Sequence, residues 1–495
     1  MLLLDITVVN VALPDIQRSL HSSFSDLQWV VNAYALTLAA LLLTAGAIAD
    51  LIGRRRVFAI GLAVFTASSL LCGLSSSALM LNLARALQGV GGAIMFATSL
   101  ALIAQAFHGR DRGTAFGIFG AVTGGAVAIG PLVGGALTSG IGWQWIFFVN
   151  VPIGVLAVLI TLTQLEESRD EDARGVDWAG LITFSAGLFL IIFSLVRGND
   201  QGWQSAPIVA SIAGGIVLLV LFVIVEMRQQ RPMLDLSLFR RPAFAGAAAV
   251  GFALSGSMFA MFLYLTLFIQ NVLGFGPLDA GLRFLPITLL SFAVAPIAGR
   301  LTVRVPVRAL FGLGMLLIAV GLLLMSGLDA RSTWTHLLPG FIIAGGGIGM
   351  VTPPLASTAI GVVPPQRSGM ASGINSTFRQ VGIATGIAAL GAIFQHEVSA
   401  RTMSALASSG QVQAVITGTH GRLQSTFGSG TTAVLARTLP AGPRGALNHA
   451  FLAAFSGALN EILTIAAALA LLGAIAGLAL VRSRDFVQSV APAPL

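Results

Sequence analysis

The residues most able to do chemistry in this chain are a few charged side chains inside long apolar runs. Asp5 follows three leucines in the stretch LLLDITVVNVALP, and Arg85 and Glu461 also lie within apolar segments. A carboxylate held away from water can bind and release a proton near neutral pH, because burial disfavours its charged form. A guanidinium beside it opposes that effect and responds when the acid is protonated. These residues predict proton coupling by Asp5 with Arg85, and by Glu461 as a second candidate.

Arg85 belongs to a stripe of polar and small residues at helical spacing. Asn82, Gln88 and Gly89 lie three or four positions away, and Gly92 lies one turn further. The stripe predicts a helix face turned toward the interior of a bundle. A guanidinium at membrane depth is costly unless a carboxylate or backbone carbonyls satisfy it. A structural arginine held by carbonyls alone is therefore the alternative to a proton-coupling partner.

Composition shows which elements must position these side chains. Of 495 residues, 56% are hydrophobic and only 9% are charged, whereas a soluble domain carries about a quarter charged residues. Apolar stretches of roughly 20 residues recur along the chain, each long enough to cross the about 30 Å hydrocarbon layer as a helix. Since backbone polar groups need internal partners there, an all-α integral membrane protein is predicted.

Apolar windows between charged, proline or glycine residues predict 14 membrane spans. They lie near residues 1–20, 28–49, 57–75, 79–106, 113–138, 144–165, 177–196, 207–227, 243–270, 278–300, 308–327, 336–361, 368–395 and 448–481. With the N-terminus inside, the short inside loops hold most of the arginines, whereas the short outside loops hold Arg18, Arg197 and Arg331. The positive-inside rule therefore predicts a multi-pass protein of the cell membrane with both termini in the cytoplasm.

A weak internal repeat predicts two related halves. The segment GAIADLIGRRR at 46–56 has a counterpart, AGRLTVRVPVR, at 298–308. Setting the two in register leaves six spans on either side of an inserted pair, an arrangement typical of transporters with a site between the halves. The expected parts are an N-terminal bundle at 1–165, an inserted segment at 166–242, a C-terminal bundle at 243–482 with a long extracytoplasmic loop at about 396–447, and a cytoplasmic tail at 483–495.

Asp50, Gly53 and three arginines form a compact charged turn after the second span. The carboxylate of Asp50 can pair with arginine, and Gly53 permits a tight turn before Arg54, Arg55 and Arg56. Such a turn can close a cytoplasmic gate in one state and release it in another. The alternative is a loop whose arginines only set membrane topology.

The fifth span carries a proline and glycines at close helical spacing. Small residues four positions apart let two helices approach closely, and the proline bends its helix by freeing a carbonyl. The residues are Gly124, Gly125, Gly130, Pro131, Gly134 and Gly135. They predict a deformable seam between the halves or, as the alternative, tight packing without a role in coupling.

Polar side chains inside or near several spans are candidates for substrate contact. They are Asn10, Asn32, Tyr34, Gln88, Gln270, Asn375 and Arg379. For Asn375 and Arg379, which share one helix face, a structural role is the alternative. Apolar walls with few polar groups suit amphipathic or cationic drugs, and they also suit lipids.

Residue usage excludes several classes of function. The chain has no lysine, so all 27 basic residues are arginine, and the ATPase motif G-x-x-x-x-G-K-[ST] is impossible. Energy is therefore expected from an ion gradient. The arginines are scattered between apolar segments, which argues against binding of nucleic acid. The six histidines are dispersed and Cys72 is the only cysteine, so no metal site, cofactor, catalytic residue or disulfide framework is expected.

Longer motifs resemble one family of membrane transporters. LDITVVNVALP at 4–14 is similar to the first-span signature of the 14-span drug:proton antiporters of the major facilitator superfamily, the quaternary-ammonium and multidrug efflux branch. Three motifs resemble the superfamily loop between spans two and three, the fourth-span arginine motif and the fifth-span antiporter motif; they are GAIADLIGRRRVF at 46–58, LNLARALQGVGGA at 81–93 and GGAVAIGPLVGG at 124–135. WQWIFFVNVPIG at 143–154 resembles the start of the sixth span, with Gln144 where an arginine is usual.

The resemblance implies a major facilitator fold of two six-helix bundles with two inserted central helices. It further implies a monomeric, proton-coupled multidrug exporter that works by alternating access, with Asp5 in proton coupling and Asp50 in a gate. Two alternatives stay open. One is an exporter of an endogenous metabolite, lipid or self-made antibiotic on the same fold, and the other is a non-transporting membrane receptor or assembly partner.

The position of Asp5 leaves two alternatives for its helix. Relatives that this chain resembles carry more residues before the signature, whereas Asp5 lies only about 6 Å from the start of a helix that begins at Met1. Either the chain lacks the first half of that helix, or the carboxylate is more solvated than in those relatives and a poorer proton carrier.

Overall fold

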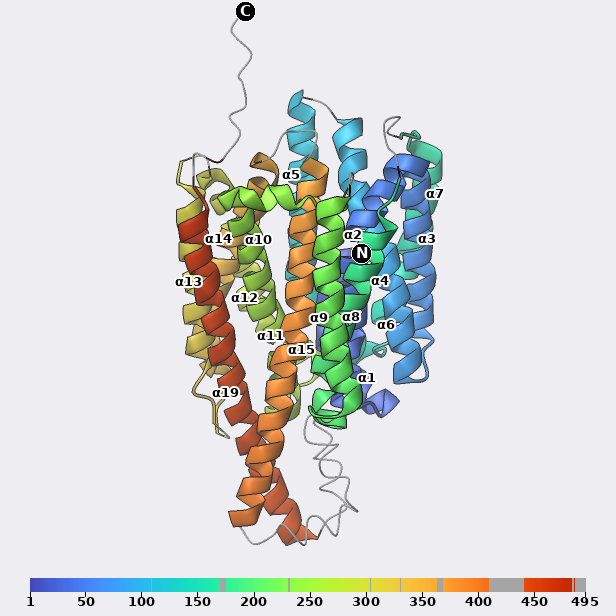
Figure 1. Ribbon diagram of the computed structural model, residues 1–495. Helices are drawn as coiled ribbons and strands as arrows, with labels where there is room; N and C mark the ends of the chain where they lie inside the picture. Colours follow the sequence, from blue (N-terminus) through green and yellow to red (C-terminus); the bar gives the residue numbers. More distant parts are fainter. Residues whose placement is uncertain are drawn as a thin grey trace, which may run out of the picture.

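The chain forms a bundle of long, roughly parallel and antiparallel helices (Figure 1). The computed structural model describes residues 1–107, 109–169, 175–229, 232–302, 304–329, 331–362, 368–408, 440–482 and 485. By length and composition, 13 helical segments within these ranges are able to cross a membrane. The first helix is not among them, and it carries Asp5, Asp15 and Arg18. Together they correspond to the 14 predicted spans.

The N-terminal half contains seven helical pieces, because the sixth span is divided in two. These are α1 (Leu2–Leu20), α2 (Phe24–Ile52), α3 (Arg54–Gly73), α4 (Ala78–Ala106), α5 (Gly109–Gly140), α6 (Trp145–Phe148) and α7 (Asn150–Gln164). Local sequence explains where they begin. The Ser23 side chain accepts a hydrogen bond from the Asp26 amide, while the Asp26 carboxylate accepts one from the Ser23 amide, a capping box that starts α2.

Two helices follow and then the C-terminal half. The inserted helices are α8 (Trp178–Gln201) and α9 (Ala206–Arg228). The C-terminal half comprises η1 (Leu236–Arg240), α10 (Pro242–Leu254), η2 (Ser255–Phe259), α11 (Ala260–Leu267), η3 (Phe268–Val272), α12 (Pro277–Leu301), α13 (Val307–Met325), η4 (Trp334–His336), α14 (Leu338–Gly361), α15 (Ser368–Ser408) and α19 (Ala441–Leu480). The pieces from α10 to η3 form one continuous helical span with π-helical turns at η2 and η3.

The two halves share one packing pattern, which confirms the predicted fold class. In the N-terminal half α4 packs against α2 and α3, α7 against α3, and α5 against α1. The C-terminal half repeats each pair in order: α14 packs against α12 and α13, α19 against α13, and α15 against α10. The halves meet where α5 lies against α12 and where α2 lies against α15.

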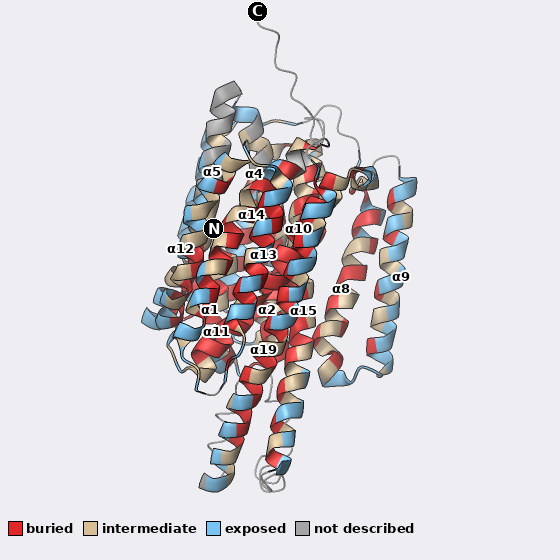
Figure 2. Ribbon diagram, turned by 90° about the vertical axis from the view of Figure 1, so that its left-hand side faces the viewer, coloured by how far each residue is buried: buried red, intermediate tan, exposed pale blue. Residues whose placement is uncertain are grey.

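The inserted pair is central in the sequence but peripheral in space. Figure 2 shows α8 and α9 at one side of the bundle, and α8 packs against α2 and α15. Two buried carboxylates anchor the pair where α8 begins and α9 ends. Asp177 caps α8 through the Gly180 amide at 2.8 Å, and Glu226 accepts a hydrogen bond from the Leu234 amide at 3.2 Å. The other carboxylate oxygen of Glu226, Oε1, is buried without a hydrogen-bond partner among the described residues.

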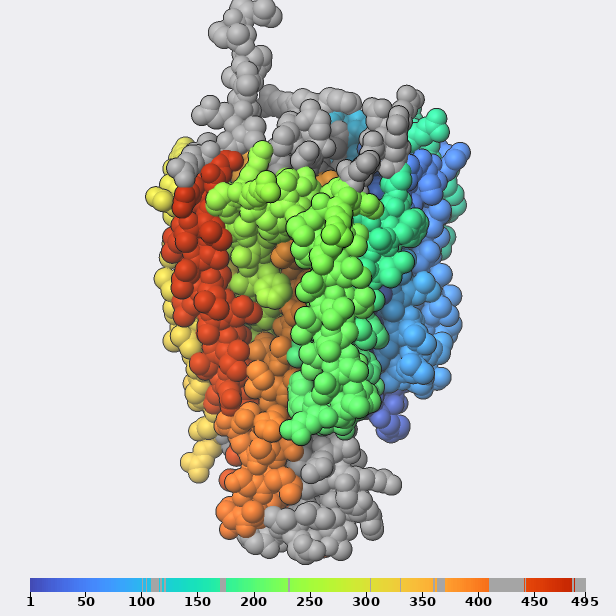
Figure 3. All heavy atoms as spheres, in the orientation of Figure 1, coloured from blue at the N-terminus to red at the C-terminus, as the bar shows by residue number. Residues whose placement is uncertain are grey.

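The long loop expected at 396–447 is shorter than predicted. Helix α15 has 41 residues and α19 has 40, so each is about 60 Å long, twice the hydrocarbon thickness. Both continue beyond the other helices at one end of the bundle (Figures 1 and 3). Buried apolar side chains on both helices, including Val398, Leu406, Leu447 and Phe451, stabilise this extension. Residues 409–439 lie outside the described part of the chain.

Candidate functional site

The bundle has two ends that must be distinguished before the site is described. The turn between α2 and α3 carries Arg54, Arg55 and Arg56, and we name its side of the bundle the arginine-rich end. The opposite side, where α15 and α19 extend furthest, is named the far end. Helices alternate in direction, so the first residues of α2 and α4 lie toward the far end.

Asp5 and Arg85 form a buried ion pair between α1 and α4. Asp5 is 2% exposed and Arg85 is 1% exposed. Arg85 Nη1 donates to Asp5 Oδ2 and, at 2.6 Å, to Gln88 Oε1, while Arg85 Nε donates to the backbone carbonyl of Val30 at 3.0 Å. The guanidinium also lies 4.3 Å from the centre of the Tyr34 ring, an attractive position for a cation.

Gln88 completes the hydrogen bonding of the Asp5 carboxylate. Its Nε2 donates to Asp5 Oδ1 at 3.0 Å and to Ser69 Oγ at 2.6 Å. We refer to Asp5, Ser69, Arg85 and Gln88 as the Asp5 cluster. The cluster joins α1, α3 and α4, because each helix contributes at least one of its side chains. Both oxygens of Asp5 and the guanidinium of Arg85 are therefore satisfied without bulk water.

This geometry bears on two expectations from the sequence. Arg85 is held by a carboxylate as well as a backbone carbonyl, so it is not held by carbonyls alone, and its part in proton coupling stays a prediction. One alternative predicted that Asp5 is more solvated. That prediction is wrong, because the Asp5 side chain is buried. The side chain is buried although the chain begins part-way along the height of the bundle (Figure 1). Protonation of Asp5 would remove its negative charge and leave the guanidinium with only neutral acceptors.

Glu461, the second acid considered for proton coupling, does not join the Asp5 cluster. It lies on α19 toward the far end, where its carboxylate accepts a hydrogen bond from Arg401 Nη2 at 2.6 Å. Arg401 also donates to Glu397 at 2.8 Å, and its own side chain is 43% exposed. The three residues form a partly exposed ion-pair group that links α15 and α19 in their extension. Sequence predicted Glu461 within a membrane span because its neighbours are apolar, and the helical segment Gly442–Leu480, which is able to cross a membrane, includes it.

The charged turn at the arginine-rich end is built as predicted around Gly53, with an additional acid. Gly53 has φ 125° and links α2 to α3. Asp50 pairs with Arg54 at 2.8 Å. The carboxylate of Glu167, which follows α7, accepts hydrogen bonds from the backbone amides of Arg55 at 3.1 Å and Arg56 at 3.3 Å. An anion at the first turn of a helix is favoured by the helix dipole.

Glu167 was missed in the sequence because it lies in the run LEESRDED, which reads as a solvated loop. A methyl group built on Gly53 would lie 2.6 Å from a carboxylate oxygen of Glu167. Only glycine therefore allows the carboxylate to approach the start of α3 so closely. The turn connects three helices of the N-terminal half through this contact.

The glycines of α5 face two different helices. A methyl group on Gly130 or Gly134 would overlap Thr7 or lie 2.7 Å from the Val8 carbonyl on α1. On Gly135 it would lie 2.5 Å from the Pro277 carbonyl at the start of α12. Gly124 and Gly125 are looser, with the Phe292 ring at 3.7 and 4.0 Å. Helix α5 is therefore packed tightly against its own half and, near the far end, against the other half.

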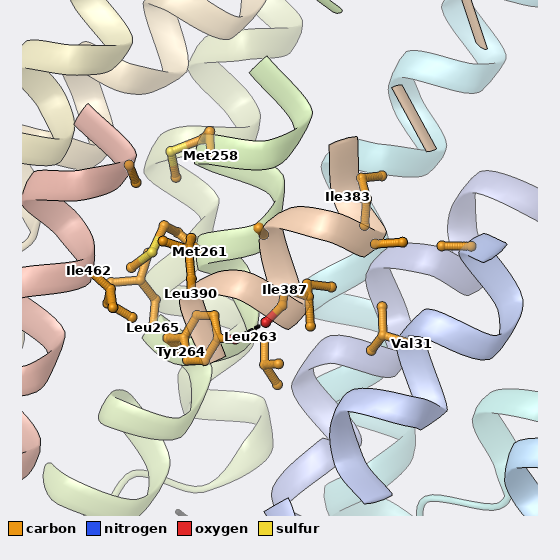
Figure 4. Packing of buried hydrophobic residues seen from close by; sticks show 14 of the residues in the cluster. Val31, Met258, Met261, Leu263, Tyr264, Leu265, Ile383, Ile387, Leu390 and Ile462 are labelled. Atoms are coloured by element: carbon orange, nitrogen blue, oxygen red, sulfur yellow. Dashed lines mark hydrogen bonds between the residues drawn. The ribbon is translucent and has the colours of Figure 1, made fainter. Parts of the chain in front are cut away.

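Hydrogen bonds between the halves gather toward the far end. Gln28 Nε2 on α2 donates to the Ile387 carbonyl on α15 at 2.9 Å and to the Tyr264 hydroxyl on α11 at 3.4 Å. Within the C-terminal half, the Tyr264 hydroxyl donates to the same Ile387 carbonyl (Figure 4). Gln270 Nε2 on η3 donates to the Val11 carbonyl on α1 at 2.7 Å. These bonds hold the two halves together at that depth.

The residues predicted to contact a substrate lie in different surroundings. Gln88 belongs to the Asp5 cluster, and Gln270 and Tyr34 bridge or contact other helices, as described above. Asn32 is fully buried with both side-chain polar atoms unpartnered, and Asn375 is 6% exposed with an unpartnered oxygen. Arg379 lies one turn after Asn375, and Asn10 is half-buried on α1. The structure does not bring all seven residues into one site.

Comparisons with known proteins point to one family. A sequence model described as Major Facilitator Superfamily matches residues 1–387. The multidrug resistance protein Stp of Mycobacterium tuberculosis (strain ATCC 25618 / H37Rv) is 38% identical over 401 residues, which cover 81% of this chain and 74% of that protein. A probable actinorhodin transporter of Streptomyces coelicolor (strain ATCC BAA-471 / A3(2) / M145) is 36% identical, with 79% and 70% covered.

A solved structure has a similar fold. It is a bacterial homologue of the human lysosomal transporter Spinster in an inward-facing, unoccupied conformation, with a TM-score of 0.61. The similarity covers 99% of this chain and 96% of that one. At 20% sequence identity it supports the fold alone.

Proposed function

Because this chain belongs to the major facilitator superfamily of membrane transporters, we propose that it is a proton-coupled exporter of drug-like small molecules. Its relatives support the direction and the class of substrate. Stp is named a multidrug resistance protein, and this chain is 38% identical to it over most of both chains.

The observation that carries proton coupling is the buried pair of Asp5 and Arg85. Few acids lie within the membrane-crossing part of the described chain, and Asp5 is the one that is fully enclosed with an arginine. Adding a proton to Asp5 would weaken its attraction to Arg85, and the interaction of α1 with α4 would change with it. An antiporter needs such a group, whose two protonation states favour two conformations.

We place the arginine-rich end in the cytoplasm, as the positive-inside rule favours. The hydrogen bonds that Gln28 donates to Ile387 and Tyr264, and that Gln270 donates to Val11, then lie on the outer side and close it. Alternating access would break these bonds, while the tight contact of α5 with α12 and the contact of α2 with α15 act as the surfaces on which the halves move. The turn at Gly53 would close the cytoplasmic side in the opposite state.

Export of a compound made by the producing cell itself is the second candidate. The relative named as a probable actinorhodin transporter favours it, because that protein is 36% identical to this chain. The same fold and the same proton coupling would serve both functions, and they differ in which compound fits between the halves.

Efflux of a fluorescent cationic dye from a pump-deficient bacterial host tests the proposal. We expect wild-type cells to export the dye faster than cells with an empty vector and to lose that difference when an uncoupler collapses the proton gradient. Asp5→Asn should be present in the membrane at normal levels and export no dye. Uncoupler-resistant efflux, or full efflux by Asp5→Asn, would refute proton coupling at this residue. No efflux across a broad drug panel would favour the second candidate.

A further inference from the structure

A second arginine in a membrane-crossing helix, Arg379, differs from Arg85 in its surroundings. Arg85 is held by a carboxylate, a backbone carbonyl and an amide oxygen. Arg379, on α15, makes no hydrogen bond or ion pair with the residues that the structure describes, and its Nε is buried without a partner. The packing of α15 therefore does not explain the arginine, because a neutral polar or an apolar residue would pack there at a lower free-energy cost.

The depth of Arg379 makes this cost large. It lies 11 positions after Ser368, the first residue of α15, or about 17 Å along the helix, and within the segment Met370–Ser408 that is able to cross a membrane. A charged group at that depth needs a compensating partner. The described acids of the facing helix α2 do not supply one, because Asp26 and Asp50 are each paired with another arginine.

The groups around Arg379 are neutral and partly unused. Asn375 lies one turn earlier on the same face, is 6% exposed, and has an unpartnered Oδ1. A methyl group built on Gly251 of α10 would lie 3.2 Å from both Arg379 Cγ and Asn375 Oδ1, and Leu355 of α14 is also near. The two side chains therefore meet where α10, α14 and α15 come together in the C-terminal half. Gln380 has an unpartnered Oε1 as well.

We infer that Arg379, with Asn375 beside it, binds an acidic oxygen group of the exported compound, such as a carboxylate or a phenolate. The inference rests on the proposed export function and names a substrate class for it. A guanidinium presents parallel N–H donors that match the two oxygens of a carboxylate, and the bond is strengthened where water is excluded. The amide of Asn375 can add a neutral donor. The anion would supply the charge compensation that the described part of the chain does not supply to Arg379.

This site separates two kinds of substrate. A compound that carries both an apolar body and an anionic oxygen would use Arg379, whereas a cationic compound would gain nothing from it and would be repelled at close range. Transport of the anionic class should therefore depend on Arg379, and transport of the cationic class should not. The Asp5 cluster, on the helices of the other half, serves both classes.

The test compares two fluorescent probes, an anionic carboxylate dye and a cationic dye of similar size, in a pump-deficient host. Arg379→Gln should lower the efflux rate of the anionic dye by about tenfold or more, the loss expected for one charge-assisted hydrogen bond, and leave that of the cationic dye within about twofold. Asn375→Asp, which places a carboxylate one turn from Arg379, should have the same effect by occupying the guanidinium. Arg379→Lys should restore part of the anionic efflux. Arg197→Gln, which changes an arginine of the inserted helix α8, is the matched control.

Several outcomes would overturn the inference. Unchanged anionic efflux in Arg379→Gln would do so, and so would an equal loss of both dyes, which indicates a structural arginine. Wild-type protein that exports only the cationic dye would reject this substrate class and leave the proposed function standing, whereas export of neither dye would reject the proposed function. If Arg379→Gln does not accumulate in the membrane, thermal unfolding of purified wild type and Asn375→Asp decides, because the anionic dye should raise the Tm of the wild type but not that of Asn375→Asp, whereas the cationic dye should shift both alike.

Discussion

Arg85 on α4 donates a hydrogen bond to the carboxylate of Asp5 on α1, 80 positions earlier in the chain. Both side chains are almost fully enclosed, at 1% and 2% exposed. Gln88 contacts both partners and prevents either from turning away without breaking a second bond. The stability of the fold and the proposed proton coupling therefore depend on the same residues, which makes this pair the first target for variants.

Removal of the Arg85 guanidinium should be more destabilising than neutralisation of Asp5. Arg85→Ala leaves a buried carboxylate without its cation, which costs about 3–5 kcal/mol in the free energy of unfolding. Asp5→Asn keeps an oxygen that accepts from Arg85, and the guanidinium retains Val30 and Gln88. Thermal or denaturant unfolding of the purified variants in detergent measures the difference.

The matched control for that pair is Arg197→Ala. Arg197 is 33% exposed and lies 3.4 Å from Asp26, so its loss should cost about 1 kcal/mol or less. Equal losses in Arg85→Ala and Arg197→Ala would contradict the view that burial makes the Asp5 pair strong.

A methyl group at Gly135 should impair transport, because it would push α5 away from α12. It would lie 2.5 Å from the Pro277 carbonyl and 2.8 Å from Leu278 Cα, and such overpacking costs about 1–3 kcal/mol. Gly140→Ala is the control on the same helix, since nothing lies within 4 Å of a methyl group there. We expect dye efflux to fall in Gly135→Ala and to be unchanged in Gly140→Ala. Equal efflux by both variants would show that the seam between the halves is not tight in the membrane.

Gly53→Ala should be destabilising for two separable reasons. The backbone has φ 125°, a conformation that alanine adopts only with strain of about 1–3 kcal/mol. In addition, the methyl group would lie 2.6 Å from the Glu167 carboxylate. The double variant with Glu167→Ala removes the overlap but keeps the strain, and so should regain part of the lost Tm.

The variant Gly202→Ala helps to separate the effect of backbone strain from the effect of steric overlap. Gly202 has φ 87° and nothing within 4 Å of a methyl group, so this variant reports backbone strain without overlap. A Tm for Gly53→Ala no lower than that of Gly202→Ala would argue against the close approach of Glu167.

Glu226→Gln should be tolerated, and Glu226→Ala should not. The wild-type carboxylate accepts a hydrogen bond from the Leu234 amide through Oε2, and its Oε1 is buried without a partner among the described residues. Glutamine keeps an oxygen that can accept the bond from Leu234, so its free energy of unfolding should stay within about 1 kcal/mol of wild type. Alanine leaves buried polar groups unsatisfied at a cost of about 1–3 kcal/mol. Limited proteolysis of the segment that joins α9 to α10 provides the readout, and equal cleavage of both variants would disprove the role of this anchor.

Much of the fold was predictable because membrane insertion is a local property. Each span needs only enough consecutive apolar residues to cross the hydrocarbon layer, and a helix satisfies its own backbone. The Gly53 turn was also predictable, since a glycine between two helices has a local conformational reason. The length of α15 and α19 was not, because beyond the bundle their helical state depends on apolar contacts with each other rather than on lipid.

The candidate site was predictable only as a set of residue types. Asp5 and Arg85 were singled out because charged residues inside spans are rare, but Glu461 met the same criterion and lies elsewhere with Arg401. Glu167 met no criterion, because an acid in a charged loop has no pattern that distinguishes it. Whether such residues contact one another depends on helices far apart in the sequence.

Composition, hydropathy and short motifs were thus sufficient to establish a helical membrane transporter with two related halves, since these features depend on residues close together in the chain. Packing of the helices was needed to pair Asp5 with Arg85, to bring Glu167 to Gly53 and to leave Arg379 without an acidic partner among the described residues. The physical reason is that a charge inside a membrane is compensated by whatever side chain a neighbouring helix presents at the same depth. That neighbour is decided by the tertiary structure and not by distance along the chain.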